Sequence, residues 1–268
     1  MSSLETTQEN VLIRILRDRR KDVAAAKRAV SINELLWIAE QRVEYRSLAA
    51  TLRHAPKPRI IAEVKKASPS AGQFRTSFDP AAIAQSYVSG GAAAISVLTE
   101  PNYFMGTPAD LKAVRRSVTV PVLRKDFLFD VYQLAEAAAW GADVVLLIVA
   151  ALEPSQLELL YQESRELGLE AIVEVHTEDE LKMALALEDA IIGVNSRNLK
   201  TLTTDLAVTY ELAKGIPADR LCIAESGIKT HEDILGLQEA GYRGFLIGES
   251  LLRETFPGKA LKALRATG

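Results

Sequence analysis

Eight short apolar runs rich in β-branched residues recur from residue 59 onward, and they constrain the fold more than any other feature. The runs are RIIAEV, AAISVL, VPVLR, ADVVLLIV, EAIVEV, AIIGV, RLCIAE and GFLIG. Successive runs lie 20 to 34 residues apart, and each gap has room for one helix. Because a parallel neighbour can be reached only through a crossover of a dozen or more residues, this alternation predicts a parallel α/β sheet.

Two closures of such a sheet compete. A doubly wound open sheet usually has about five or six strands, whereas eight units over residues 59–268 match a (β/α)8 TIM barrel. We therefore expect one (β/α)8 barrel domain over residues 1–268, of which residues 1–58 form an N-terminal helical extension. Apolar residues at helical spacing predict two helices there, one around residues 11–16 and one that reaches Val43.

Composition excludes several classes of protein. With 48% hydrophobic and 25% charged residues, the chain can bury a core, and its net charge of −3 gives no general attraction to nucleic acid or anionic lipid. The longest uncharged apolar run has nine residues, too few to span a bilayer, and the N-terminus lacks the basic start of a signal peptide. We expect a cytoplasmic protein without nucleic-acid or membrane partners, in which the lone Cys222 is a buried thiol.

Polar residues follow the apolar runs at the points where the predicted strands end. In a (β/α)8 barrel, the C-terminal ends of the strands carry the reactive groups. Glu63 and Lys65 are two positions apart, so both side chains should face the same way, inward. The other run ends carry Lys125, Glu174, Asn195, Arg197 and Glu225. Acids and bases that converge at one mouth predict a site with perturbed pKa values.

Glycines follow the last two runs and suggest a phosphate ligand. Ser226-Gly227 and Gly248-Glu249 lie at strand-to-helix turns, where backbone N–H groups of many barrels bind phosphate. The planar guanidinium of Arg197 suits a carboxylate. The glycines therefore suggest a phosphate ligand, whereas Arg197 taken alone is more often part of a surface ion pair.

Other chemistries find little support in the sequence. The three histidines, His54, His176 and His231, have no metal-ligand spacing, so we expect no metal site. The sequence also carries neither a dinucleotide fingerprint nor a serine-hydrolase arrangement. His231 should begin a helix. His176 follows the strand that ends in Glu174, where it either assists proton transfer or serves the structure.

Segments at all eight runs resemble the indole-3-glycerol phosphate synthase family. They are IIAEVKKASPSAG, SVLTEPNYFMG, VPVLRKDF, GADVVLLIV, EAIVEVH, IIGVNSRNL, IAESGI and FLIGESLL. The resemblance implies a carboxy-lyase of tryptophan biosynthesis. Its reaction closes the ring of 1-(2-carboxyphenylamino)-1-deoxy-D-ribulose 5-phosphate, with loss of CO2 and water, to give indole-3-glycerol phosphate. It implies no cofactor and no metal.

The same resemblance implies the roles of three catalytic residues. Lys125 of KDF is expected to be the general acid that protonates the substrate carbonyl, and Glu174 of EVH the general base for the later dehydration. Glu63 of AEVK is expected to stabilise cationic intermediates. A lysine proton is mobile only if its pKa is lowered, which we expect burial to do for Lys125.

The resemblance also implies the substrate-binding positions. The positions expected to orient the substrate and its carboxylate are Lys65, Ser68, Asn195 and Arg197. Those expected to line an apolar pocket for the aromatic ring are Phe104, Phe127 and Leu146. Those expected to bind the phosphate are Ser226, Gly227, Gly248 and Glu249, with Glu225 beside them. The three apolar residues could instead serve only core packing. Two positions depart from the family pattern, because Ala71 replaces a basic residue and Glu249 stands where some relatives have serine. Both departures concern phosphate affinity.

Two alternatives remain open from the sequence. On the same barrel, a Schiff-base aldolase or another sugar-phosphate lyase would use Lys125 or Lys65 as a nucleophile. A barrel without catalytic activity would only bind a phosphorylated ligand or a partner protein. The mixture of acids and bases at the strand ends favours an enzyme, which we expect to be a monomer or a weak homodimer.

Overall fold

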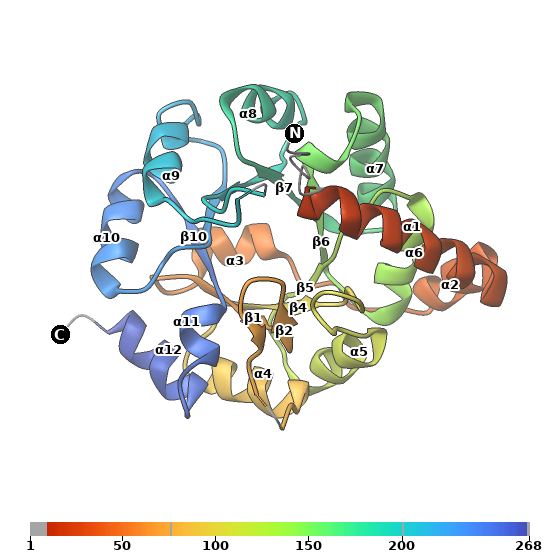
Figure 1. The fold of residues 1–268 in the computed structure, drawn as a ribbon, viewed down its shortest axis with the longest axis horizontal. Coiled ribbons are helices and arrows are strands. Elements are labelled where there is room, and N and C mark those ends of the chain that lie inside the picture. The colour runs from red at the N-terminus through yellow and green to blue at the C-terminus, as the bar shows by residue number, and fades with distance from the viewer. Residues whose placement is uncertain (1–9, 76, 200, 267–268) are drawn as a thin grey trace, which may run out of the picture.

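The expected strands form one closed parallel barrel in the computed structural model, which describes residues 10–75, 77–199 and 201–266. In Figure 1 the strands ring the centre and the helices lie outside them. The barrel strands are β1 (Ile60–Val64), β4 (Ala94–Leu98), β5 (Val122–Lys125), β6 (Val144–Ile148), β7 (Glu170–Val175), β8 (Ile191–Asn195), β9 (Cys222–Glu225) and β10 (Gly244–Ile247). Because β1 pairs in parallel with both β4 and β10, the sheet closes, and the barrel rather than the open sheet is confirmed.

Helices follow the strands and cover the outside of the barrel. They are α4 (Pro80–Ser89), α5 (Pro108–Ser117), α6 (Val131–Trp140), α7 (Pro154–Glu166), α8 (Glu178–Leu185), α9 (Leu206–Ala213), α10 (His231–Glu239), α11 (Glu249–Leu252) and α12 (Pro257–Arg265), with a short 3-10 turn, η1 (Val149–Ala151), after β6. Asp and Thr side chains cap most of the helices that follow loops, as Thr177 does for α8. His231 is the first residue of α10, as expected.

Three helices make up the N-terminal extension: α1 (Val11–Ala29), α2 (Ile32–Glu40) and α3 (Leu48–His54). The prediction that the second helix reaches Val43 is wrong, because α2 ends at Glu40 and Val43 is fully exposed. Beyond α2 the chain is held in an irregular conformation by Arg42, whose guanidinium contacts the Ala142 carbonyl and Asp143 of the barrel. Polar contacts with the barrel therefore override the apolar spacing.

The third helix closes the N-terminal end of the barrel. Leu48 and Leu52 of α3 are fully buried and pack with interior strand residues such as Ile61 and Ile223. A second, larger apolar layer lies between the strands and the outer helices. With its base filled in this way, the barrel interior is open to a ligand at the opposite end.

The loop after β1 contains a small antiparallel hairpin that the sequence did not suggest. It pairs β2 (Ala67–Ser68) with β3 (Gly72–Gln73), and the Ala67 N–H donates to the Phe104 carbonyl in the loop after β4. Gly72 has φ +68°, a conformation that favours glycine. The hairpin therefore places Ser68 beside the mouth of the barrel.

Cys222 is a buried thiol, as expected, and burial raises its pKa to about 11. Within the part of the chain that the structure describes, no helix combines the length and the apolar character needed to cross a bilayer. Residues 1–9, whose sequence argued against a signal peptide, lie outside the described residues.

Candidate active site

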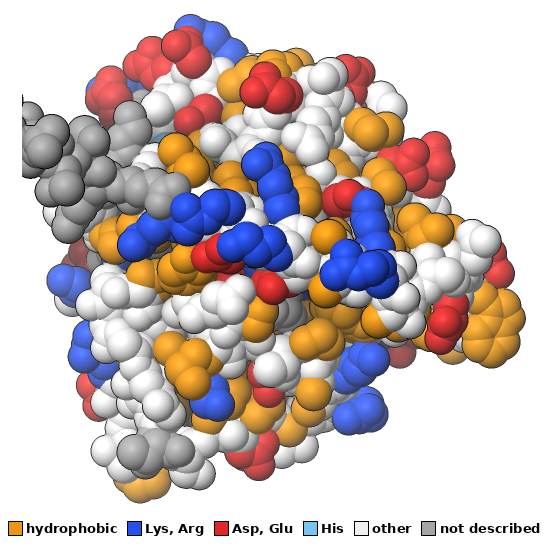
Figure 2. Space-filling view, turned by 45° about the vertical axis from the view of Figure 1, so that its right-hand side comes forward, with side chains coloured by type: hydrophobic (Ala, Val, Ile, Leu, Met, Phe, Trp, Pro, Cys, Tyr) orange, Lys and Arg blue, Asp and Glu red, His pale blue; other side chains and the backbone are white. Residues whose placement is uncertain are grey.

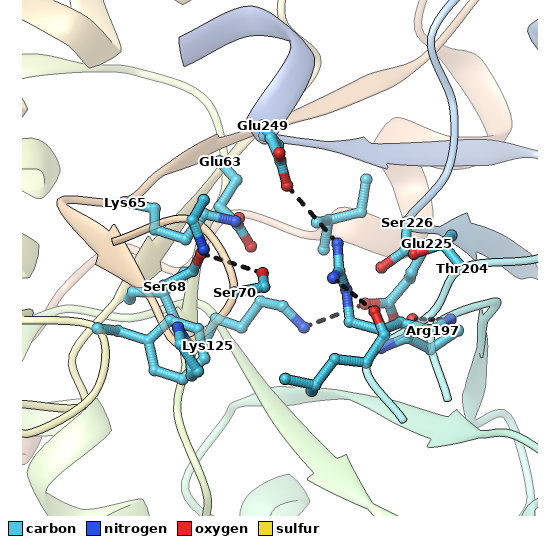
Figure 3. Close-up of a pocket in the computed structure, with 18 of the residues that line it drawn as sticks. Glu63, Lys65, Ser68, Ser70, Lys125, Arg197, Thr204, Glu225, Ser226 and Glu249 are labelled. Atoms are coloured by element: carbon cyan, nitrogen blue, oxygen red, sulfur yellow. Dashed lines mark hydrogen bonds and ion pairs between the residues drawn. The ribbon is translucent and has the colours of Figure 1, made fainter. Parts of the chain in front are cut away.

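A cavity of about 740 Å³ opens at the C-terminal ends of the barrel strands. Every site residue expected from the sequence lines it: Glu63, Lys65, Ser68, Phe104, Lys125, Phe127, Leu146, Glu174, Asn195, Arg197, Glu225, Ser226, Gly227, Gly248 and Glu249. Figure 3 shows Glu63, Lys65 and Lys125 on one side of the cavity and Arg197, Glu225 and Ser226 on the other. The fold thus brings these residues together, while the role of each stays a prediction.

Lys125 is the centre of the charged cluster in the cavity. Its Nζ lies 3.3 Å from Oε2 of Glu174 and 3.1 Å from Oε2 of Glu225. The three residues end or nearly end β5, β7 and β9, and each occupies an inward-facing position of its strand. Both carboxylates are almost fully buried, so one ammonium group is shared by two acids that are shielded from water.

The expectation that burial lowers the pKa of Lys125 is wrong. Burial acts in that direction, but the carboxylates of Glu225, Glu174 and Glu63 outweigh it and raise the pKa above its usual value. These three acids come from other strands, and the pattern of one strand does not reveal them. Lys125 is therefore an ammonium group that holds its proton more firmly than expected, so it can donate only to an oxygen that becomes strongly basic during the reaction.

The two acids that share Lys125 have opposite ionisation preferences. Burial and the neighbouring carboxylate of Glu174 raise the pKa of Glu225 to about 7, although Lys125 acts against them. Burial also acts on Glu174, but Lys125, His176 and Asn195 outweigh it and lower its pKa. Oε1 of Glu225 is buried without a hydrogen-bond partner, which suits a carboxyl group that is easily protonated. Glu174 is the carboxylate available as a base.

Glu63 and Lys65 form a second ion pair across the cavity. Lys65 Nζ lies 2.6 Å from Oε1 of Glu63, so the prediction that both side chains face the same way is confirmed. Glu63 is buried, whereas Lys65 lies at the edge of the cavity near the Phe74 ring. This pair places a buried carboxylate and an ammonium group next to each other at the cavity wall.

Two glycines leave space for the buried acids: Gly193 on β8 and Gly248 directly after β10. A Cβ at Gly193 would lie 2.3 Å from Oε1 of Glu225, and a Cβ at Gly248 would lie 2.5 Å from Oε1 of Glu63. Real side chains do not approach so closely, so each acid occupies the space that a glycine leaves. Gly193 was missed by the sequence analysis, because nothing in an apolar strand marks a glycine as the neighbour of a distant acid.

The end of the cavity where we expect a phosphate to bind, called the phosphate end below, is built from the turns after β9 and β10. Ser226 and Gly227 have φ values of +66° and +77°, a left-handed pair that exposes backbone N–H groups. Such a conformation strains a serine and is typical of functional sites. Glu225 lies next to this turn in sequence, but its carboxylate points to Lys125 instead. Both turns therefore leave their backbone free for an anion.

A carboxylate lies among the cations at this end. Glu249 Oε1 is 2.7 Å from Arg253, and its Oε2 is 3.7 Å from Arg197. The Arg253 guanidinium is the main cause that lowers the pKa of Glu249, so this side chain is ionised. Ala71 also lines the cavity and adds no charge. The two departures from the family pattern are thus both at the cavity.

The apolar wall contains residues that the sequence analysis missed. Phe104 and Phe127 both line the cavity, with ring centroids 6.1 Å apart and planes tilted by 37°. Among the missed residues are Val11, Leu12 and Ile15 of α1, which lies across this end of the barrel (Figure 1). Their helical spacing had indicated only a buried face, and more than 100 residues separate them from Lys125 in sequence.

Helix α1 is bound to the loop that directly follows β5 by a buried ion pair. Arg19 donates hydrogen bonds of 3.0 and 2.8 Å to the two oxygens of Asp126, the residue after Lys125. Thr99 and Arg124 also donate to Asp126. Figure 2 shows the face that carries α1, where basic side chains gather with acidic ones among them. The extension is therefore a wall of the cavity as well as an addition to the fold.

Among the described residues, no group of three or more histidine, cysteine, aspartate or glutamate side chains could hold a metal ion. The chemistry available to the cavity from this chain is that of its ammonium, guanidinium and carboxylate groups. That no metal takes part in the reaction stays a prediction from the sequence.

The barrel is closed, and at its mouth an ammonium group lies between two acids, next to a glycine-containing turn. These features together indicate a barrel enzyme that acts on a phosphorylated small molecule by acid–base chemistry. The family model described as "Indole-3-glycerol phosphate synthase" matches residues 12–264. The chain belongs to this family of carboxy-lyases of tryptophan biosynthesis.

Named relatives are similar in sequence to this chain over nearly its whole length. An indole-3-glycerol phosphate synthase of Carboxydothermus hydrogenoformans is 45% identical over 263 residues, which cover 95% of this chain and 99% of the relative. One of Mycolicibacterium gilvum is 48% identical over 258 residues, covering 96% of this chain and 94% of the relative. The match therefore includes the N-terminal extension as well as the barrel.

Solved structures that are similar to this chain support the fold alone. A thiamine phosphate pyrophosphorylase of Pyrococcus furiosus has a TM-score of 0.59 at 15% identity, covering 82% of this chain and 96% of its own. The tryptophan synthase alpha subunit of Legionella pneumophila has a TM-score of 0.57 at 15% identity, covering 81% of this chain and 96% of its own.

Proposed function

We propose that this chain closes the indole ring of 1-(2-carboxyphenylamino)-1-deoxy-D-ribulose 5-phosphate, releasing CO2 and water to give indole-3-glycerol phosphate. The observation that supports this proposal most strongly is Lys125, which lies between an ionised acid and an easily protonated one in a cavity with an anion-binding turn. The membership of the family agrees with it.

Lys125 donates the first proton in this proposal. The ring carbon that carries the carboxylate attacks the carbonyl carbon of the sugar, and the carbonyl oxygen takes the proton and becomes a hydroxyl. A carbon–carbon bond forms, and the positive charge passes to the ring and its nitrogen. Glu63, a buried acid paired with Lys65, stabilises this cation by the charge of its carboxylate.

Loss of CO2 then returns an electron pair to the ring. The new hydroxyl takes a second proton, which comes from the solvent, and leaves as water. Glu174 accepts the proton whose removal completes the double bond of the indole, which requires that it be ionised. Asn195 and Arg197 orient the substrate carboxylate, while Ser226 and its neighbours bind the phosphate. Phe104 and Phe127 contact the aromatic ring.

The assay that tests the proposal follows indole fluorescence when the purified chain is mixed with the carboxyphenylamino sugar phosphate. We expect indole-3-glycerol phosphate and CO2 in equal amounts, and full activity in EDTA. A chain that binds the substrate but forms no indole would favour the non-catalytic alternative. A substrate adduct trapped on Lys125 or Lys65 by borohydride would favour the Schiff-base alternative.

The surroundings in which the enzyme works are part of the proposal. A net charge of −3 and a buried, lone cysteine suit a cytoplasmic enzyme that is a monomer or a weak homodimer. Size-exclusion chromatography with light scattering at several concentrations tests the oligomeric state. A dimer that persists on dilution would contradict it.

A further inference from the structure

His176 follows β7 directly and lies on the other side of Glu174 from Lys125. Its Nε2 is 3.4 Å from Oε1 of Glu174, while Oε2 of Glu174 faces Lys125 Nζ at 3.3 Å. The His176 side chain is only 12% exposed and does not line the cavity, so it cannot touch a substrate there. Each oxygen of the Glu174 carboxylate thus has its own basic neighbour.

Glu180, in the first turn of α8, holds His176 in turn. Its Oε2 accepts a hydrogen bond of 2.6 Å from the His176 backbone N–H and lies 3.4 Å from Nδ1 of the ring. The Glu180 N–H donates to the hydroxyl of Thr177, which begins the helix, so the position of Glu180 is fixed by the helix start. The imidazole therefore lies between two carboxylates.

Charges from several elements determine the ionisation of His176. Burial acts to lower its pKa, but Glu180, Glu174 and Glu225 outweigh burial and raise it. Neither ring nitrogen makes a hydrogen bond of normal geometry, so the contacts with the acids are electrostatic. The charged groups around the Glu174–His176 pair are Lys125 on β5, Glu225 on β9 and Glu180 on α8, with the neutral Asn195 on β8.

We propose that His176 is a positioning residue, which holds the Glu174 carboxylate toward Lys125 and the cavity and is itself held by Glu180. The inference rests on the proposed function, in which Glu174 accepts a proton and must be ionised and correctly aimed. Without the imidazolium, the Glu174 carboxylate would keep Lys125 as a cationic neighbour but lose the one on its other side. Glu174 would then be easier to protonate and freer to turn.

The test compares the pH dependence of kcat for the wild type, His176→Asn and Glu180→Gln. Loss of a cation next to Glu174 raises its pKa, so the acidic limb of kcat in His176→Asn moves to higher pH by about one unit. At pH 7 we expect kcat to fall about tenfold and KM to change less than twofold, because His176 does not contact the substrate. In Glu180→Gln, His176 still carries its charge in the acid range, so we expect the limb to stay where it is. Because the ring is no longer held in place, we expect kcat at pH 7 to fall, by less than in His176→Asn, with KM little changed.

His231→Asn is the matched control, because this histidine lies on α10 and its Nδ1 contacts the Leu264 carbonyl, away from the cavity. We expect it to keep the wild-type limb. A folded His176→Asn with wild-type kcat and limb would overturn the inference. If that variant does not fold, a wild-type kcat at pH 7 in Glu180→Gln overturns it.

The wild type separates this inference from the function on which it rests. An inactive wild-type chain would overturn both, whereas an active wild type with variants of wild-type kinetics would overturn only the role of His176.

Discussion

The two ends of the cavity hold charge in different ways. At the proton-transfer end, Lys125 contacts two acids that are almost fully buried, and their pKa values move in opposite directions. At the phosphate end, Glu249 is 35% exposed and pairs with two arginines that water also reaches. Fixed and desolvated charges control chemistry, whereas solvated pairs are weak and exchange partners easily. Substitutions at the first end should therefore change kcat, and substitutions at the second should change KM.

The largest effect is expected for Lys125→Ala. Loss of the general acid should lower kcat by roughly 10²-fold or more and leave substrate binding largely intact, as a steady-state assay can measure. Lys112→Ala, on the exposed face of α5, is the control and should have wild-type kinetics. An unchanged kcat in Lys125→Ala would remove this residue from the mechanism.

A smaller loss of kcat is expected for Gly193→Ala. The added Cβ lies where Oε1 of Glu225 now lies, so the acid must move away from Lys125. Displacing Glu225 from its place beside Lys125 should lower kcat about 10-fold and change KM little. Gly215→Ala controls for loss of glycine in general, since its backbone is not left-handed and its Cβ would come no closer than 3.1 Å, to the Leu181 side chain. Equal kinetics for the two variants would show that Gly193 does not position Glu225.

Glu249→Ser should act on KM instead. Removing a like charge from the phosphate end should lower KM by up to about fivefold, the range of solvated ion pairs, and leave kcat within a factor of two. The decrease should shrink at high salt, because the interaction is exposed. Glu239→Ser on α10 serves as the control. A fall in kcat of tenfold would contradict the division between the two ends.

The smallest effect is on stability, in Glu225→Gln. The pKa of Glu225 is about 7 in the folded chain, above its unfolded value, so ionisation on going from pH 5 to pH 8 costs the folded state free energy. The glutamine variant lacks this cost. Its unfolding temperature relative to wild type should therefore be higher at pH 8 than at pH 5, by a few degrees, for about 1 kcal/mol or more. A difference that does not depend on pH would contradict the raised pKa.

The strands and their inward-facing residues could be predicted because each depends on a local pattern. An apolar run followed by alternating polar residues specifies both a strand and which side chains share a face, as for Glu63 and Lys65. The pKa of Lys125 could not be predicted in this way, because three strands other than its own bring acids to it. The same holds for Gly193, whose neighbour Glu225 comes from another strand.

Long-range contacts also explain what the sequence analysis missed in the extension. The apolar residues of α1 were identified as a buried face, but their partner, the cavity, becomes visible only when the barrel is closed. Val43 continued an apolar spacing, yet Arg42 draws the chain to the barrel and ends α2 before it. In both cases a contact about 100 residues away determines the local outcome.

At the centre of the cavity, two acids share one ammonium group and differ in ionisation. Infrared titration of the carboxyl stretch measures this directly, with Glu225→Gln to assign the band. We expect a buried protonated carboxyl band in the wild type that persists to about pH 7 and is absent from Glu225→Gln. A wild type without such a band above pH 5, or a band that remains in Glu225→Gln, would contradict it.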